Sequence, residues 1–313
     1  MRAIGIDIGG SHAVCAVIED RRILAAESQP VGDASCLAGL LPALAANVAR
    51  LFERCGLTAA ACDGVAVSFP GIVEPFAGRI LSTPKGKYDD SGSLDLCRWS
   101  RDCFGLPLRI ENDARMALLG ERYCGALQGC DDAVMLTLGT GVGGAVLSGG
   151  RLLRGKHLQA GLGGHIPVLF HGRACICGSR GCVEAESSTW ALPEICRAWP
   201  GFVQSALARE PVLDFAALFR SSAAGDPVAV AVRDRCLAVW ASGAVGLIHA
   251  FDPEAIVFGG AVMQSADQIL PPVEQYIHAN AWTPWGKVRV LKAALGSDAG
   301  LLGAVPLLSE NNQ

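Results

Sequence analysis

The chain has 313 residues, a formal net charge of −4 and 18% charged residues, a balance that leaves no broad basic face for nucleic acid or an anionic membrane. Its length suggests two lobes, and no apolar run reaches the roughly 18 residues that indicate a membrane span. The start, MRAIGIDIGG, enters a strand pattern directly, without the apolar region and cleavage site of a secretory signal. We therefore expect a cytoplasmic protein that acts on small molecules, with no nucleic-acid or membrane partner.

Strand and helix patterns alternate through the first third of the chain. Residues 3–8 and 13–18 are typical of a hairpin whose turn is Gly9-Gly10-Ser11. A strand at 106–110 should deliver Glu111-Asn112-Asp113 to the start of a helix at 114–126. The other elements expected here are a helix at 34–55, a strand at 64–68 before a Phe69-Pro70-Gly71 turn, and a helix at 94–103.

The pattern of the opening hairpin returns in VMLTLGTGVGGAVLSGG, at residues 134–150. The chain is therefore expected to contain two related halves, unless the two glycine hairpins arose independently. An insertion rich in glycine, histidine and cysteine follows at 151–186. The remaining elements are expected to be helices through 187–250, a strand at 255–258, a helix at 265–279, a strand at 288–291 and a helix at 299–308. This alternation predicts an α/β protein with a lobe boundary near Ile110.

Three glycine turns follow apolar strands, and each exposes backbone N–H groups that can bind a phosphate: residues 7–11, 139–144 and 259–260. A single such turn is more typical of a structural turn than of a binding site. Neither the Walker pattern nor a strand–GxGxxG–helix unit is present, which disfavours those two routes to nucleotide binding. Asp7, between a strand and two glycines, is able to hold Mg²⁺ through water.

Asn112 and Asp113 allow two interpretations. At a strand-to-helix junction, Asn and Asp commonly accept the first free helix N–H groups, so a structural N-cap is the simpler one. In the functional interpretation Asn112 bonds a substrate hydroxyl and Asp113 accepts the proton of the attacking hydroxyl. A carboxylate suffices for that role, because in a loose phosphoryl-transfer transition state the hydroxyl becomes acidic only late.

His165, Cys175, Cys177 and Cys182 form the most specific local pattern, CxCGxxGC with a histidine ten residues upstream. Three sulfurs and one nitrogen make a closed tetrahedral set for zinc, so we expect a structural metal. Gly178 and Gly181 allow the chain reversal between the cysteines. Glu184 follows the last ligand and, taken alone, is typical of a solvated glutamate.

These motifs occur in one order along the chain: IGIDIGGSHAVCAV, SFPGIV, IENDARMALLGE, LTLGTGVGGAV, GLGGHIPV, CICGSRGCVE and IVFGGAV. Together they closely resemble the ROK family of sugar kinases, repressors and related proteins. The resemblance implies an actin-like, ribonuclease H-like two-lobed fold with ATP and Mg²⁺ in the interlobe cleft, and a homodimer. It implies a small lobe at 1–110, to which a last helix at about 295–313 returns, and a large lobe at 111–294 with a zinc-binding insertion at about 160–186.

The resemblance also assigns residues. ATP and its phosphates map onto Asp7, Gly9, Gly10, Ser11, Gly139, Thr140, Gly141, Gly259 and Gly260. Sugar contacts map onto Asn112, Asp113, His165 and Glu184, with Asp113 as the general base. His165 would then offer one ring nitrogen to zinc and the other to a sugar hydroxyl.

One position departs from the family pattern. Kinases of the family usually carry glutamate in a GExGH motif, where this chain has Leu162. A hydrogen bond to a charged carboxylate contributes about 1.5–3 kcal/mol, so we expect Leu162 to weaken glucose binding or to favour a sugar that lacks a hydroxyl, or carries an apolar group, at the facing carbon. The GHIPV stretch also looks like allose kinases of the family.

The leading hypothesis is therefore ATP-dependent phosphorylation of an aldohexose, glucose-like, at its terminal hydroxyl. Allose or an N-acetylated hexosamine is an alternative substrate. Two alternatives come from other functional classes. A sugar-responsive repressor is disfavoured, because repressors of the family carry a helix-turn-helix before the glycine hairpin and only Met1 and Arg2 precede the first strand here. A non-catalytic sugar-binding protein is disfavoured by the presence of Asp7, Asp113 and the glycine turns.

Overall fold

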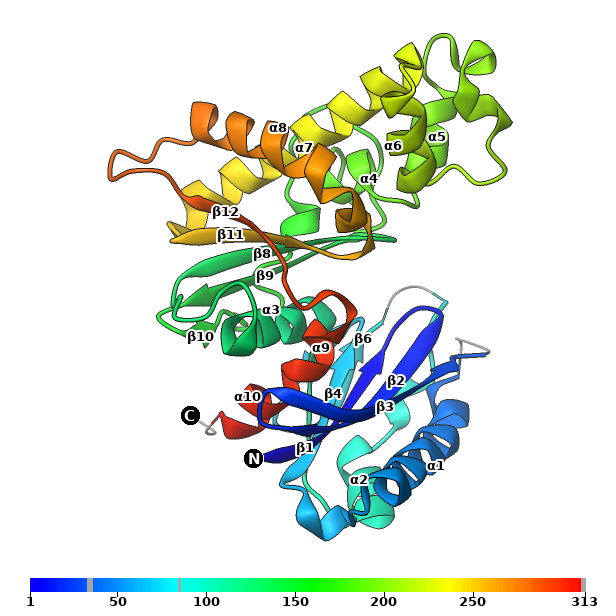
Figure 1. The fold of residues 1–313 in the computed structure, drawn as a ribbon, viewed down its shortest axis with the longest axis vertical. Helices are drawn as coiled ribbons and strands as arrows, with labels where there is room; N and C mark the ends of the chain where they lie inside the picture. The colour runs from blue at the N-terminus through cyan, green and yellow to red at the C-terminus, as the bar shows by residue number, and fades with distance from the viewer. Residues whose placement is uncertain (33–35, 84–85, 311–313) are drawn as a thin grey trace. The chain divides into compact units, whose positions relative to one another are not determined.

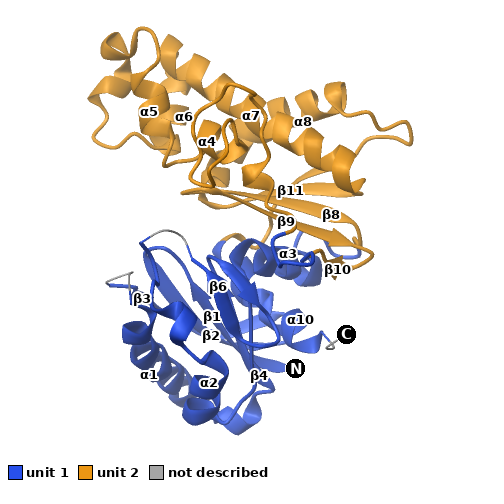
Figure 2. Cartoon of the chain, turned by 180° about the vertical axis from the view of Figure 1, so that it is seen from behind, with its two compact units in different colours: residues 1–129, 154–159, 297–313 blue, residues 130–153, 160–296 orange. Residues whose placement is uncertain are grey.

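The computed structural model describes residues 1–32, 36–83 and 86–310, and the chain divides into two compact units. The first comprises Met1–Gly129, Arg154–Gln159 and Ser297–Gln313, and the second comprises Cys130–Leu153 and Ala160–Gly296 (Figure 2). Within the described ranges, no helix is both long and apolar enough to cross a membrane.

The first unit is built on a five-stranded sheet in the order β3-β2-β1-β4-β7 (Figure 1). Its central strands β1, β4 and β7 are parallel, whereas β2 and β3 are antiparallel. The strands of this sheet are β1 (Arg2–Ile8), β2 (His12–Glu19), β3 (Arg22–Pro30), β4 (Gly64–Phe69) and β7 (Leu108–Asn112), with β5 (Ile72–Glu74) and β6 (Arg79–Ser82) forming a separate hairpin.

Successive side chains of strand β1 point to opposite faces of the sheet, and a different helix packs on each face. Ile4, Ile6 and Ile8 belong to one buried cluster with the apolar side of α1 (Leu37–Cys55). On the other face, Gly5 lies against Leu301 of α9 (Ala299–Leu302). The remaining helices of this unit are α2 (Leu96–Phe104), α3 (Asp113–Cys124) and α10 (Ala304–Ser309).

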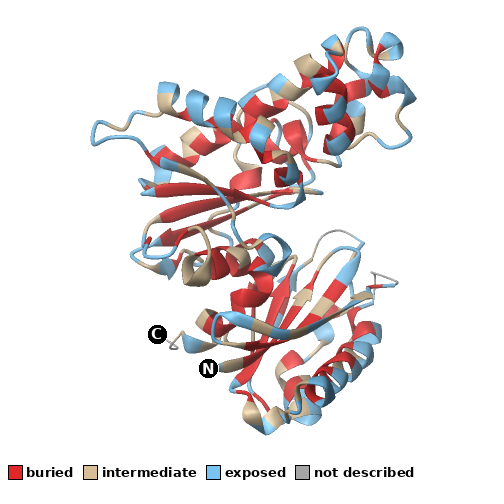
Figure 3. Cartoon of the chain, viewed as in Figure 1, coloured by how far each residue is buried: buried red, intermediate tan, exposed pale blue. Residues whose placement is uncertain are grey.

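The second unit repeats this sheet in the order β10-β9-β8-β11-β12, with the same sequence of antiparallel and parallel pairs. The expectation of two related halves is therefore confirmed. Its elements are β8 (Ala133–Leu138), β9 (Val142–Ser148), β10 (Arg151–Leu152), α4 (Val183–Ser187), α5 (Leu192–Arg197), α6 (Phe215–Ala223), α7 (Pro227–Phe251), β11 (Ala255–Gly259), α8 (Ala266–Asn280) and β12 (Arg289–Lys292). Figure 3 shows the sheet strands of this unit largely buried beneath its helices.

The helix ends follow local chemistry. Asp226 caps α7 through its carboxylate and is followed by Pro227 at the first helical position, where a missing N–H costs nothing. Helix α1 ends at Gly56, which has φ 63° and satisfies the last carbonyls. The predicted start of α1 at Ala34 lies outside the described residues.

Several predicted boundaries differ from the structure. Strand β3 and the β5–β6 hairpin were not assigned bounds. Every second residue of β3 is exposed and none is fully buried, and β5 and β6 have only three and four residues, so neither gives a clear apolar strand pattern. The predicted helix at 299–308 is two helices, since Pro306 lacks the N–H that would bond the carbonyl of Leu302. The first unit extends past Ile110, because α3 packs on α9, α10 and the first sheet. Residues 297–310 lie in that same unit.

Candidate active site and metal centre

The candidate residues fall into two sets, one in each unit. The first unit holds Asp7, Gly9, Gly10, Ser11, Asn112 and Asp113, and the second holds Gly139, Thr140, Gly141, His165, Cys175, Cys177, Cys182, Glu184, Gly259 and Gly260.

Asn112 is the last residue of β7 and the N-cap of α3. Its Oδ1 accepts hydrogen bonds from the backbone N–H groups of Ala114 at 3.1 Å and Arg115 at 3.3 Å. Its Nδ2 donates to the Gly71 carbonyl at 3.2 Å and to Asp113 Oδ1 at 2.9 Å. Both donors and both acceptor sites of the amide are occupied, so in this conformation Asn112 orients Asp113. Its contact with a substrate hydroxyl stays a prediction.

Asp113 keeps one oxygen available. Oδ1 accepts from Asn112 and from the Ala114 N–H at 2.8 Å, whereas Oδ2 has no hydrogen-bond partner within the described ranges. Asp113 is an exposed residue, yet desolvation by the surrounding protein, with a smaller contribution from the nearby negative charge of Asp7, raises the pKa of its carboxyl group to about 6. A carboxylate with a raised pKa and a free oxygen is suited to accept a proton.

Asp7 is the last residue but one of β1, and its side chain lies on the same face of the strand as Gly5. Burial raises the pKa of its carboxyl group. A Cβ added at Gly300 would lie 3.2 Å from Asp7 Oδ2, so the glycine leaves room for the carboxylate. Ser68 lies opposite Asp7 in the β1–β4 register, and its buried hydroxyl interacts with the Asp7 carboxylate, which opposes part of this rise in pKa. These groups can hold water or a hydrated cation, the form in which proteins commonly bind Mg²⁺.

A buried ion-pair network lies behind Asn112. Glu111 is fully buried, and its Oε1 accepts from the Asn112 backbone N–H at 2.9 Å. Its Oε2 accepts from Arg154 Nε at 2.6 Å, and Arg154 also donates to Glu310 Oε2 at 2.6 Å. The network joins the strand that carries Asn112 to the C-terminal helix α10.

The first glycine turn is held by two side chains that the sequence motifs did not single out. Gly9 N–H donates to the His12 carbonyl at 2.9 Å, and the Tyr88 hydroxyl donates to the Gly9 carbonyl at 2.7 Å. Lys87 Nζ donates to the Gly10 carbonyl at 3.3 Å. An ammonium group therefore lies beside a turn whose Gly10 and Ser11 amides have no acceptor among the described residues.

The second glycine turn is joined to Glu184. Glu184 is 7% exposed, and its Oε2 accepts from the Val142 backbone N–H at 2.9 Å. Its Oε1 is buried and has no hydrogen-bond partner among the described residues, and a Cβ at Gly141 would overlap the carboxylate. The interpretation of Glu184 as a solvated glutamate is therefore wrong. A buried carboxylate oxygen without a donor indicates a missing ligand or water.

The Gly259-Gly260 turn lies next to this second turn. β11 is parallel to β8, and a Cβ at Gly260 would overlap the Leu138 carbonyl oxygen at the end of β8. Two of the three predicted phosphate turns thus lie side by side, at the C-terminal ends of the neighbouring strands β8 and β11.

The four predicted zinc ligands come together. Their donor atoms all lie within 4.8 Å of one another. Cys177 Sγ and Cys182 Sγ are 3.7 Å apart, and Cys175 Sγ lies 3.6 Å from His165 Nδ1. A tetrahedral zinc with bonds of about 2.3 Å to sulfur and about 2.0 Å to nitrogen requires separations of about 3.8 and 3.6 Å. The donor set therefore fits zinc, and His165 Nε2 is left free of the cluster.

The loop that carries the cysteines is braced independently of any metal. Gly181, with φ 67°, lies so close to the Leu169 carbonyl that a side chain would overlap it. Glu186, fully buried, accepts from the Arg173 backbone N–H at 2.5 Å and pairs with Arg235 of α7.

Leu162 is 39% exposed and lies one turn before His165, whose N–H donates to the Leu162 carbonyl at 3.0 Å. The carbonyl belongs to the backbone, so a glutamate at this position would keep that bond and add only its carboxylate.

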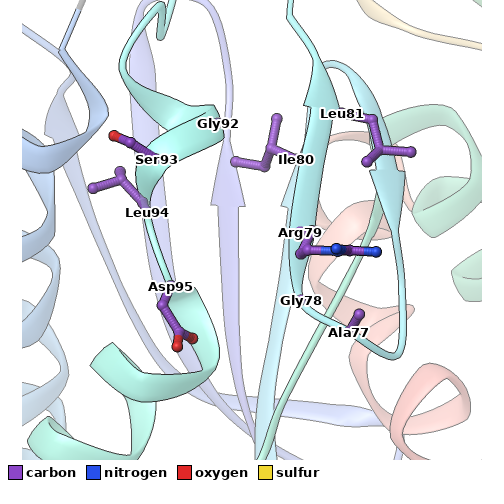
Figure 4. A pocket seen from close by; sticks show the side chains of 9 residues that line it. All are labelled: Ala77, Gly78, Arg79, Ile80, Leu81, Gly92, Ser93, Leu94 and Asp95. Carbon is purple, nitrogen blue, oxygen red and sulfur yellow. The ribbon is translucent and has the colours of Figure 1, made fainter.

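A cavity of about 500 Å³ opens between β6 and the segment before α2. Figure 4 shows Arg79, Ile80 and Leu81 on one side and Ser93, Leu94 and Asp95 on the other. Arg79 pairs with Glu74, and Asp95 caps α2. None of the candidate residues lines the cavity, and its polar groups are already paired, so it is not the site that the motifs predict.

Two sheets of ribonuclease H topology, each with glycine turns at strand ends, define an actin-like ATPase fold. A ROK family model matches residues 3–311, and the chain belongs to the ROK family.

Its relatives include a glucokinase from Thermotoga maritima, 30% identical over 99% of this chain and 98% of the relative. A solved ROK hexokinase from Thermus thermophilus is 30% identical, with a TM-score of 0.79 over 98% of this chain and 97% of that one. A ROK family glucokinase from Streptomyces griseus, solved with glucose and AMPPNP, is 31% identical, with a TM-score of 0.79 over 98% and 99%.

Proposed function

We propose that the protein is an ATP-dependent kinase that phosphorylates a glucose-type aldohexose at its terminal hydroxyl. The observation that carries the proposal is Asp113, a carboxylate with a raised pKa and one free oxygen, held in place by Asn112. The relatives named glucokinase, and the glucokinase solved with glucose and AMPPNP, support the choice of both substrates.

In the proposed reaction, Asp113 Oδ2 accepts the proton of the attacking sugar hydroxyl while the γ-phosphoryl group moves to the sugar oxygen. ADP is the leaving group. Asn112 fixes the carboxylate, so little reorganisation is needed when the proton moves.

The glycine turns would hold the phosphates. The amides of Gly10 and Ser11, and those of Thr140 and Gly141, donate to no acceptor within the described part of the chain, and Lys87 adds a positive charge at the first turn. Mg²⁺, held through water by Asp7, would neutralise phosphate charge.

Glu184 and His165 are proposed sugar contacts. Within residues 1–32, 36–83 and 86–310, Glu184 Oε1 has no hydrogen-bond donor, and a sugar hydroxyl would supply one. His165 Nε2 lies outside the metal cluster. The cluster itself would hold a structural zinc through His165, Cys175, Cys177 and Cys182. We further propose that the protein works as a cytoplasmic homodimer, which light scattering of the purified protein would test.

The test is an assay coupled to ADP release, run with glucose, allose, mannose and the N-acetylated hexosamines. Turnover of an aldohexose with ATP, and product phosphorylated at the terminal hydroxyl by NMR, is the expected result. If none of these sugars supports ATP turnover, the proposal is contradicted and a non-catalytic sugar-binding protein is favoured.

A further inference from the structure

The segment after α4 is tied to the second phosphate turn by backbone hydrogen bonds. The Thr189 N–H donates to the Gly139 carbonyl at 3.2 Å, and the Trp190 N–H donates to the Thr140 carbonyl at 3.1 Å. These bonds occupy the carbonyl groups of the turn and leave the Thr140 and Gly141 amides open. Any anion bound by those amides is therefore bound beside the backbone of Trp190.

Trp190 is unusual for its surroundings. Its side chain is 37% exposed, whereas Ser188, Ala191 and Leu192 on either side are buried. In the described ranges, no other ring contacts the indole and its N–H has no hydrogen-bond partner. A single exposed apolar side chain needs no explanation, but this one is held by its backbone at a turn that also adjoins Gly260.

We propose that the Trp190 indole contacts the base of the nucleotide whose phosphates occupy this turn. The inference rests on the proposed function, and it adds a specificity-determining residue that none of the glycine motifs contains. An indole is a large, rigid surface for a flat ring, and loss of aromatic stacking on a nucleic-acid base weakens binding by about five- to a hundredfold or more. Stacking recognises the ring rather than its hydrogen-bonding groups, so ATP should bind better than triphosphate without a base.

The test separates the base from the phosphates. We expect Trp190→Ala to raise the KM for ATP by about tenfold, the equivalent of ~1.4 kcal/mol, and to leave the inhibition constant of magnesium tripolyphosphate unchanged. Trp190→Phe should recover part of the loss. Trp282→Ala is the matched control, because Trp282 is 83% exposed in the same unit, on the loop after α8, and should leave both constants as in wild type.

Two outcomes overturn the inference. Equal weakening of ATP and tripolyphosphate in Trp190→Ala would mean that the substitution disturbs the turn itself, and no change in either constant would mean that the indole is not in contact with the base.

A second measurement does not depend on catalysis. The chain has six tryptophans, and MgATP without sugar should quench part of their fluorescence in wild type but not in Trp190→Phe. If no sugar is phosphorylated, the proposed function fails while this quenching still decides the inference. If a sugar is phosphorylated and the quenching persists in Trp190→Phe, the inference alone fails.

Discussion

Glu184 accepts a hydrogen bond from the backbone N–H of Val142 at 2.9 Å, within the second phosphate turn, and its other oxygen is buried without a partner in the part of the chain that the structure describes. One carboxylate thus fixes the end of a proposed phosphate turn and offers an acceptor to a proposed sugar. Because both roles depend on the same side chain, a disturbance of its position should affect both substrates.

Gly141→Ala tests this link. The added Cβ would overlap the Glu184 carboxylate, so we expect kcat/KM to fall for the sugar and for ATP alike, each by about tenfold or more, ~1.4 kcal/mol per decade. Gly246→Ala in α7 is the control, since a Cβ there meets open space. Steady-state kinetics with each substrate varied in turn would measure the effect, and a fall confined to ATP would contradict the shared role of Glu184.

Asp113→Asn should reduce kcat by about 10²–10⁴-fold, the usual contribution of a positioned general base, with a much smaller change in the KM for the sugar. The amide keeps the shape of the side chain but cannot accept the proton. Undiminished turnover would remove Asp113 from this role.

The raised pKa of Asp113 predicts a pH dependence. Since the base acts when deprotonated, kcat/KM should rise with pH through an apparent pKa of about 6 and level off above it. The folded-state pKa exceeds the unfolded value, so the carboxyl contributes stability below the unfolded pKa that is lost as pH rises through about 6. Thermal unfolding of Asp113→Asn should therefore show its largest gain over wild type above pH 6. An equal difference at pH 5 and pH 8 would contradict the raised pKa.

The metal cluster predicts one zinc per chain by elemental analysis. Cys177→Ser should lower zinc content and the melting temperature, because a structural zinc contributes directly to folding. Cys103→Ser, another exposed cysteine but in α2 of the other unit, is the control and should change neither. Zinc content unaffected by Cys177→Ser would exclude the four-ligand site.

Leu162→Glu should change the order in which sugars are preferred, raising kcat/KM for glucose by about ten- to a hundredfold if the carboxylate gains a bond of about 1.5–3 kcal/mol. Leu169→Glu, equally exposed in the same insertion, controls for added charge. An unchanged ranking across the hexose panel would reject the hypothesis.

Features that depend on a short stretch of sequence could be predicted from the sequence alone. The grouping of His165 with three cysteines, both glycine hairpins and the N-cap position of Asn112 were predicted from spacing and composition, and the actin-like fold followed from the family resemblance. Lys87 and Tyr88 were missed because they act on the Gly9-Gly10 turn from a polar loop about 78 residues away in sequence, a contact that no local pattern encodes.

The sequence also did not indicate how far individual side chains are buried. Glu184 lies two residues after Cys182, and nothing in the local sequence indicates that α4 would bury it. Glu111 likewise gave no sign of its bond to Arg154. Trp190 presented the opposite case, an apolar side chain left exposed. Such differences depend on the packing of whole elements rather than on neighbours along the chain.

The bond from Arg154 to Glu310 has a consequence for biosynthesis. The first unit contains the first 129 residues, yet it also requires residues 154–159 and the segment from Ser297 onward. While the chain emerges from the ribosome, strand β7, which carries Glu111 and Asn112, is made before almost the entire second unit, and its ion-pair network can close only after Glu310 has been made. Such long-range contacts slow folding, and the unit that is made first is thus completed last.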